Sequence, residues 1–180
     1  MAGFRQTSEE ELLRAWIFKV HKVYVEDPSG QIFDRFVIRH PGAVAVVPLH
    51  DDGTVSLVRQ YRAPVDAMVL EIPAGTRDRK ESLLDTAHRE LAEECGLAAA
   101  SLEELLGTWN TPGISDQETW LYLATGLTEV ESRPDGIEED YMTIEKIHLD
   151  QVDELVADGS IKDESTVLGL YVARARYRGS

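Results

Sequence analysis

The sequence predicts an α/β fold in which helices pack on a mixed β-sheet. Strand-like and helix-like stretches interleave along the chain, which is typical of layered α/β or α+β domains. The chain has 180 residues, of which 43% are hydrophobic and 28% are charged, an ordinary balance for a globular protein. A chain of this length and composition is expected to bury a single core.

The first half of the chain predicts strands joined by short turns. Runs rich in β-branched and aromatic residues flank turn residues, with Pro28 and Gly30 in a first hairpin and Gly53 in a second. A further short strand is stopped by Pro73 and Gly75. The strands predicted in this half are 15–27, 31–40, 42–49, 54–62 and 67–75.

Residues 81–95 predict the clearest helix. Apolar residues recur there at helical spacing, and Gly96 is placed to end the helix. We expect Leu84, Leu91 and Cys95 to face the sheet, on the side opposite to the acidic residues of the helix.

The second half predicts strands first and helices last. Strands are expected at 102–110, 119–127 and 142–149, and helices at 149–159 and 163–177. No internal repeat or interdomain linker separates these elements. We divide the chain into an N-terminal hairpin region, 1–40, and a main domain, 41–180.

Charge and cysteine content argue against several classes of protein. The formal net charge of −15 argues against nucleic acid as a partner, because nucleic-acid binding depends on a basic surface. No apolar run approaches the roughly 20 residues that span a bilayer, and the N-terminus does not read as a secretory signal. Cys95 is the single cysteine, which excludes an internal disulfide and fits a cytoplasmic location.

The helix at 81–95 concentrates acidic residues on one edge. Glu90 and Glu94 lie one turn apart on nearly the same face, and Glu93 flanks them. Together they form an oxygen-rich site suited to a hard cation such as Mg²⁺. The alternative is a solvated acidic face with one ion pair between Arg89 and Glu93, and helix geometry by itself favours that alternative.

The spacing of residues 75–97 favours the cation site over the solvated acidic face. The segment reads Gly-x5-Glu-x7-Arg-Glu-Leu-x-Glu-Glu-x-Gly-Leu. At average residue usage, its seven identities other than the two leucines would coincide on the order of once in 10⁸ windows. This pattern resembles the box of the Nudix hydrolases. The segments "LVRQYR", "LEIPAG" and "TPGISDQETWLYLATGL" resemble the ADP-ribose pyrophosphatase branch, so that the similarity covers approximately 39–171.

The resemblance implies an α/β/α sandwich around a mixed β-sheet and hydrolysis of a nucleoside diphosphate linked to another group. It implies that Glu90 and Glu94 are catalytic and bind Mg²⁺, for which Mn²⁺ can substitute, together with the backbone carbonyl of Ala74. Glu93 is expected as a further ligand or as an acceptor beside the site. Arg89 is expected to orient Glu93 or the preceding loop.

The same resemblance assigns a general base and the residues that hold the substrate. The base is expected from a downstream loop, as Glu139, with Glu138 as the alternative. The resemblance places Arg62 at the phosphate or the terminal ribose of the substrate. Glu71 is expected either to bind ribose hydroxyls or only to cap its strand. Arg39 and Ser115 are further candidates for binding the substrate. Gln117 replaces an acid that this branch often has, so no acidic contact is expected there.

The N-terminal hairpin predicts a homodimer. Its aromatic and aliphatic residues are more than a two-stranded element can bury, and relatives exchange this region between subunits. Among Trp16, Trp109 and Trp120, we favour Trp16 to stack on the base of a substrate bound by the partner.

Three functions are compatible with these residues. The first is hydrolysis of ADP-ribose to AMP and ribose 5-phosphate. The second is hydrolysis of another nucleotide sugar, such as GDP-mannose, by the same residues. The third is a module that senses ADP-ribose without cleaving it, against which the complete acidic cluster argues.

Overall fold

The structure, a computed structural model, describes residues 3–77, 80–132 and 141–177. The chain divides into two compact units. The smaller unit consists of the residues up to Gly42 together with Trp109–Glu118, and the larger unit consists of Ala43–Thr108 and the residues from Thr119 onward.

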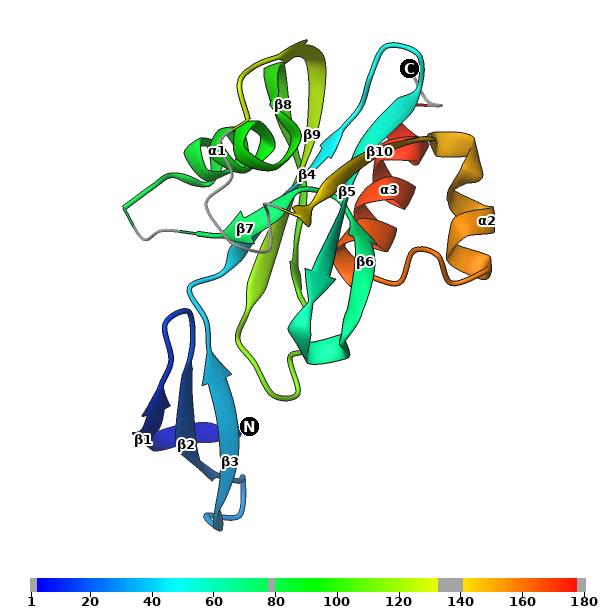
Figure 1. Cartoon of the computed structure of the whole chain (residues 1–180). Coiled ribbons are helices and arrows are strands. Elements are labelled where there is room, and N and C mark those ends of the chain that lie inside the picture. The colour runs from blue at the N-terminus through cyan, green and yellow to red at the C-terminus, as the bar shows by residue number, and fades with distance from the viewer. Residues whose placement is uncertain (1–2, 78–79, 133–140, 178–180) are drawn as a thin grey trace. The chain divides into compact units, whose positions relative to one another are not determined.

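Ten strands and three α-helices are assigned within the described residues (Figure 1). The strands are β1 Arg5–Arg14, β2 Lys19–Glu26, β3 Ile32–Arg39, β4 Ala43–Pro48, β5 Thr54–Arg62, β6 Ala67–Glu71, β7 Ala74–Thr76, β8 Leu97–Trp109, β9 Glu118–Glu129 and β10 Thr143–His148. The helices are α1 Leu83–Cys95, α2 Val152–Ala157 and α3 Glu164–Tyr177. Short 3₁₀ turns, Ala63–Val65 and Leu149–Gln151, follow β5 and β10.

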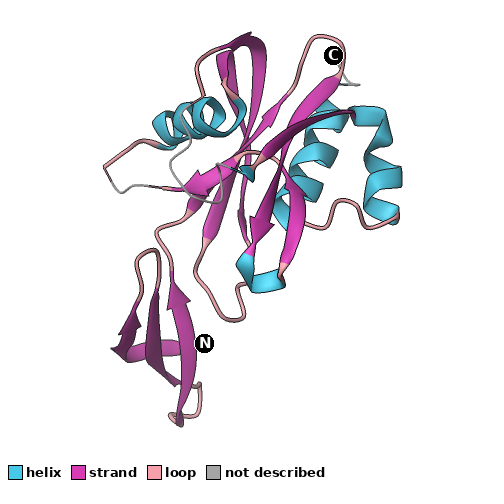
Figure 2. Cartoon of the chain, in the orientation of Figure 1, coloured by secondary structure: helices cyan, strands magenta, loops and turns pink. Residues whose placement is uncertain are grey.

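The smaller unit is built on an antiparallel sheet in the order β1-β2-β3. Its described residues contain strands and loops but no helix (Figure 2). The hairpin expected over 15–40 is present as β2 and β3, although the first strand begins at Lys19. The strand β1 was not predicted, because its charged sequence has no apolar alternation and every residue of it is exposed. It is instead defined by its pairing with β2, from Arg5 opposite Glu26 to Arg14 opposite Lys19.

The larger unit is an α/β/α sandwich. In β4, Val44 and Val46 point to the face that α1 covers, and Ala45 and Val47 point to the face that α3 covers, as the two-residue period of a strand requires. Figure 1 shows α1 on one side of β4 and α3 on the other. β4 pairs with β9 in parallel and with β7 in antiparallel fashion, so the sheet is mixed. The predicted fold class is confirmed.

The helix α1 has the expected ends but a different orientation. Ser82 caps its start by accepting a hydrogen bond from the Asp85 amide at 3.1 Å, and Gly96 ends it with a left-handed φ of 61°. Leu84 was predicted to face the sheet, and this prediction is wrong because its side chain is 47% exposed. The helix buries Ala87, Leu91 and Cys95 in the core, and it also buries Glu90 and Glu94. With these faces buried, Leu84 is left on the exposed side of the helix.

The strand expected over 67–75 is divided in two. β6 belongs to the sheet β10-β5-β6, whereas β7 belongs to the sheet β7-β4-β9-β8. Ile72 and Pro73 carry the chain from one sheet to the other, and the Pro73 carbonyl accepts a hydrogen bond from the Val46 amide at 2.9 Å. Proline has no amide hydrogen for a strand ladder, so the crossing falls at this residue.

No helix within the described residues is both long and apolar enough to cross a membrane.

Candidate active site

Two carboxylates of α1 are buried against the start of β7. Glu90 is 6% exposed and Glu94 is 4% exposed, although both are charged residues that normally face water. The amide of Ala74 donates a hydrogen bond to Oε2 of Glu94 at 2.8 Å. A solvated acidic face, the alternative that helix geometry favoured, is therefore excluded for these two residues.

The missing side chain of Gly75 makes room for Glu90. A β-carbon built on Gly75 would lie 1.9 Å from Oε1 and 2.3 Å from Oε2 of Glu90. Glu90 therefore rests directly on the backbone of β7, next to Ala74. Two carboxylates and a short backbone segment meet at this point, and such oxygen donors are those that Mg²⁺ prefers. The residues present fit a divalent cation.

Arg89 holds the acidic cluster together. Its Nη1 lies 2.7 Å from Oε1 of Glu90 and 2.9 Å from Oε2 of Glu93. Its Nε and Nη2 donate to Glu81 at 3.2 Å, which ties the helix to the residue before its cap. Burial by itself lowers the pKa of Arg89, but the surrounding carboxylates outweigh it and raise that pKa above its ordinary value. Arg89 thus contacts Glu93, and its orienting role toward Glu93 stays a prediction.

Glu93 is placed differently from its two neighbours. Its side chain is 24% exposed, against 8% for Glu90, and it bonds to Arg89 at the rim of the buried pair. Within residues 3–77, 80–132 and 141–177, no three His, Cys, Asp or Glu side chains converge closely enough to form a metal site by themselves. The buried set consists of Glu90 and Glu94 beside the backbone of Ala74.

Two predicted substrate residues, Arg62 and Glu71, bind each other. Nε of Arg62 donates to both carboxylate oxygens of Glu71 at 3.0–3.1 Å, and Nη2 donates to Oε2 at 2.5 Å. Glu71 is 6% exposed, whereas the Arg62 side chain is 43% exposed. The pair therefore presents a partly accessible guanidinium on a buried acid, and the fork geometry of arginine suits a second bidentate partner such as phosphate.

The charge of Arg62 is coupled to the acidic residues around it. Burial lowers the pKa of Arg62, and the hydrogen bond and charge of Glu71, with smaller effects of Glu94 and Asp163, outweigh it so that the pKa is raised. Gln60 also donates to Glu71, at 3.3 Å. Gln60 was not predicted at the site, although its position two residues before Arg62 in a strand places both side chains on one face.

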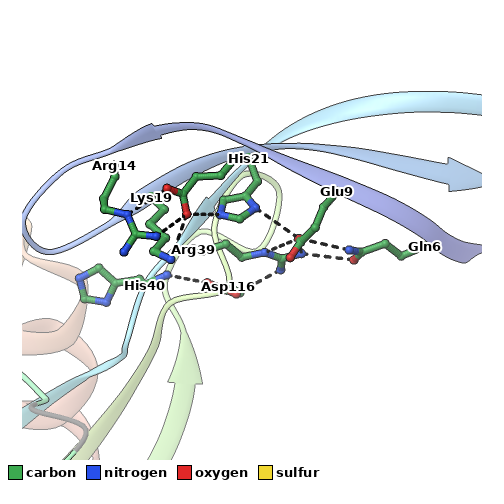
Figure 3. Close-up of polar contacts among 9 residues, drawn as sticks. Gln6, Glu9, Arg14, Lys19, His21, Arg39, His40 and Asp116 are labelled. Carbon is green, nitrogen blue, oxygen red and sulfur yellow. Dashed lines mark hydrogen bonds and ion pairs between the residues drawn. The ribbon is translucent and has the colours of Figure 1, made fainter.

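Arg39 and Ser115 lie in the smaller unit. Nη2 of Arg39 contacts Oε2 of Glu9 at 2.6 Å and Nη1 contacts Oδ2 of Asp116 at 3.1 Å (Figure 3). Asp116 also accepts a hydrogen bond from the His40 amide at 2.9 Å. Ser115 is 9% exposed, and its hydroxyl oxygen accepts a hydrogen bond from the Gln117 amide. In this structure Arg39 thus links β1 to the loop that precedes β9.

The remaining candidates have different surroundings. Glu139 and its alternative Glu138 lie outside the described residues. Trp16 is fully exposed and Trp109 is 65% exposed. Trp120 instead packs against the apolar core between α1 and β4, and the guanidinium of Arg77 lies over its ring. Trp16 and Trp109 are thus accessible to stack on a ligand.

Comparison with known proteins gives a consistent result. The NUDIX domain family matches residues 39–166 of this chain. The ADP-ribose pyrophosphatase of Mycobacterium tuberculosis is 36% identical over 174 residues, covering 96% of this chain and 84% of the relative. That of Bacillus subtilis is 32% identical over 171 residues, covering 92% of each chain. The methanol dehydrogenase activator of Bacillus methanolicus is 33% identical, covering 89% of this chain and 87% of the relative.

A solved structure shares the fold. The crystal structure of an ADP compounds hydrolase superposes with a TM-score of 0.84 and covers 99% of this chain and 96% of that one, at 24% sequence identity. The residues that match the NUDIX domain family make up most of the chain, and they include α1, the helix that carries Glu90 and Glu94. The chain therefore belongs to the Nudix family of hydrolases.

Proposed function

We propose that the protein is a metal-dependent pyrophosphatase that hydrolyses ADP-ribose to AMP and ribose 5-phosphate. The observation that carries this proposal is the burial of Glu90 and Glu94 against Ala74 and Gly75. Arg89 contacts three carboxylates, those of Glu81, Glu90 and Glu93, so its single positive charge does not balance theirs, and a bound cation would compensate the remaining negative charge. The relatives named ADP-ribose pyrophosphatase support the choice of substrate.

Glu90, Glu94 and the carbonyl of Ala74 would hold Mg²⁺ or Mn²⁺. Such an ion, when bound, lowers the pKa of water and screens the negative charge of a diphosphate. Arg89 holds Glu93 at the rim of this group, where the Glu93 carboxylate would accept a hydrogen bond from a water molecule of the site. The hydrogen bond from the Ala74 amide fixes the Glu94 carboxylate at the start of β7.

Arg62 is proposed to bind the diphosphate or the terminal ribose. Its guanidinium is held on one side by Glu71 and is partly exposed on the other. A chain with a net charge of −15 repels a free nucleotide sugar, so that positively charged groups are needed at the site itself. Glu71 would thereby act on substrate through Arg62, and ribose contacts of Glu71 remain a prediction.

Glu139 is proposed as the general base that takes the proton of the attacking water, with Glu138 as the alternative. A carboxylate is suited to this role when it lies within hydrogen-bond reach of the water. Glu139→Gln should slow turnover while leaving the affinity for Mn²⁺ nearly unchanged. Wild-type turnover by Glu139→Gln would move the assignment to Glu138, which the corresponding variant tests.

We also propose a homodimer formed through the smaller unit. Large apolar side chains are exposed on this unit, more than an isolated domain usually presents. They are Phe4, Leu12, Leu13, Trp16, Ile17, Phe18, Ile32, Phe36, Trp109 and Ile114. A second copy of the chain is the proposed partner that covers them.

One experiment separates the candidate functions. The protein is incubated with Mg²⁺ and a panel of nucleotide sugars, including ADP-ribose and GDP-mannose, and the products are identified by chromatography. Release of AMP and ribose 5-phosphate as the preferred reaction supports the proposal. Preferential cleavage of GDP-mannose would overturn the choice of substrate, and binding of ADP-ribose without cleavage would indicate a sensor.

Glu94→Gln provides the matched inactive variant. Glutamine keeps an oxygen that can accept the Ala74 hydrogen bond but removes the charge, so the fold should survive while turnover falls by about 10²-fold or more. Glu10→Gln, on the exposed strand β1, is the control for loss of one acidic charge. If Glu94→Gln cleaves ADP-ribose at the wild-type rate, the proposed metal site is wrong.

A further inference from the structure

The backbone of Ile72, Pro73 and Ala74, where the chain passes from β6 into β7, is hydrogen-bonded to three different elements of secondary structure. The Ile72 amide donates to the hydroxyl of Thr166 in α3 at 2.9 Å. The Pro73 carbonyl accepts from Val46 in β4 at 2.9 Å, and the Ala74 amide donates to Glu94 in α1 at 2.8 Å. This segment crosses between two sheets, so neither sheet ladder fixes Ile72.

The Thr166 hydroxyl is oriented for this contact. It donates to Oδ2 of Asp163 at 2.7 Å, and the same oxygen accepts the Thr166 amide at 2.8 Å. Asp163 thus has the contacts of an N-cap residue at the start of α3. Because a hydroxyl has a single hydrogen, donation to Asp163 leaves its lone pairs directed to Ile72.

The contact is fully enclosed. Thr166 is 0% exposed and Ile72 is 1% exposed, so water cannot replace the hydroxyl as an acceptor without rearrangement. The close packing of α3 on this segment is also visible at Gly169, where a β-carbon would lie 3.2 Å from Cδ1 of Ile72. Loss of the hydroxyl would leave the Ile72 amide buried without this acceptor, a costly state.

We propose that Thr166 is a positioning residue of the active site, which acts through Ile72 to place Ala74 against Glu94. This inference rests on the proposed function, since it assigns Glu94 and the Ala74 carbonyl to the metal site. The hydrogen bonds of Thr166 described above join it to Ile72 and Asp163. Its effect passes along two peptide units, and the conformation of Pro73 between them is restricted by its ring.

Thr166→Val tests the proposal, because valine keeps the branched shape of threonine and lacks the hydroxyl. Thr166→Ser keeps the hydroxyl and is the conservative control. Val172→Ala, a partly buried position later in α3, controls for general loosening of that helix. Asp163→Ala is unsuitable, because the Asp163 charge also acts on Arg62.

The first measurement is amide hydrogen exchange of Ala74 in the metal-free protein, followed by NMR. Thr166→Val should raise this exchange rate about tenfold, as expected for loss of one buried hydrogen bond. Thr166→Ser and Val172→Ala should stay near the wild-type rate. An unchanged rate in Thr166→Val, or an equal increase in Val172→Ala, overturns the proposal.

The second measurement is the affinity for Mn²⁺ alone, by titration calorimetry. Thr166→Val should bind about tenfold more weakly, within the range expected when a residue that supports a metal ligand is removed. Absence of Mn²⁺ binding by the wild-type protein overturns the proposed function, whereas the exchange of Ala74 still decides the role of Thr166. Should Thr166→Val not fold, Thr166→Cys, with its weakly accepting sulfur, takes its place in both measurements with the same expected results.

Discussion

Oε1 of Glu90 lies 1.9 Å from the point where a β-carbon on Gly75 would stand. The glycine at the start of the Nudix box therefore has a steric role, because it allows a buried carboxylate to rest on the backbone of β7. Any other residue at this position would displace either the strand or Glu90.

Gly75→Ala should consequently impair the proposed metal site while the protein stays folded. A shift of Glu90 by about 1 Å is enough to lower turnover about 10²-fold, and the affinity for Mn²⁺ should fall as well. Steady-state kinetics and calorimetry measure both effects. Gly113→Ala is the control, since a β-carbon there meets no heavy atom within 4 Å. Wild-type kinetics in Gly75→Ala would contradict this account.

Arg62 and Glu71 should be coupled in stability. Arg62→Ala removes the guanidinium hydrogen bonds of the buried Glu71 and should lower the free energy of unfolding by on the order of 1–3 kcal/mol. The double variant with Glu71→Gln should lose less than the sum of the single variants, with a coupling of roughly 0.5–3 kcal/mol. Urea denaturation of the four proteins measures this coupling, and additive losses would contradict it.

The proposed role of Arg62 in substrate binding should be measurable by steady-state kinetics. Arg62→Lys keeps the charge but loses the bidentate fork, so KM for ADP-ribose should rise more than kcat falls. Arg59→Lys is the matched control, because Arg59 pairs with Glu145 on the neighbouring strand. An unchanged KM in Arg62→Lys would show that Arg62 serves the fold alone.

The oligomeric state should depend on the exposed apolar residues of the smaller unit. Size-exclusion chromatography with light scattering should give twice the chain mass of 20.1 kDa at micromolar concentration. The double variant Ile32→Ser and Phe36→Ser, at positions that are 60% and 61% exposed, should shift the protein toward the monomer. Met68→Ser, at an exposed position of the larger unit, should leave it unchanged. A wild-type monomer would reject the dimer.

Stability should fall as the solution becomes mildly acidic, in part through His50. Burial, with a smaller effect of Lys146, lowers the pKa of His50 from its ordinary value of 6.5. The unfolded chain therefore binds a proton at a higher pH than the folded protein does, so the free energy of unfolding decreases as the pH falls below about 6.5. His50→Gln should flatten this decrease in chemical denaturation at pH 7 and pH 5.5. An unchanged pH dependence in His50→Gln would contradict this prediction.

The parts of the fold that could be predicted are those encoded by local pattern. Helical spacing of apolar residues and a following glycine located α1 to within two residues, since helix ends depend on nearby caps. The strand β1 could not be predicted, because its charged residues form a strand only when β2 provides hydrogen-bond partners. The orientation of Leu84 also depended on what the helix packs against, and amphipathic periodicity misplaced it.

The sequence alone determined the family and predicted which acids of α1 form the proposed metal site, because residue spacing along one helix is a local property of the chain. The tertiary structure decided that Glu90 and Glu94 are buried, that Arg62 binds Glu71, and that Thr166 reaches Ile72. Each of these contacts joins different elements of secondary structure. Their formation depends on packing of the whole unit, and no spacing within a single element reveals it.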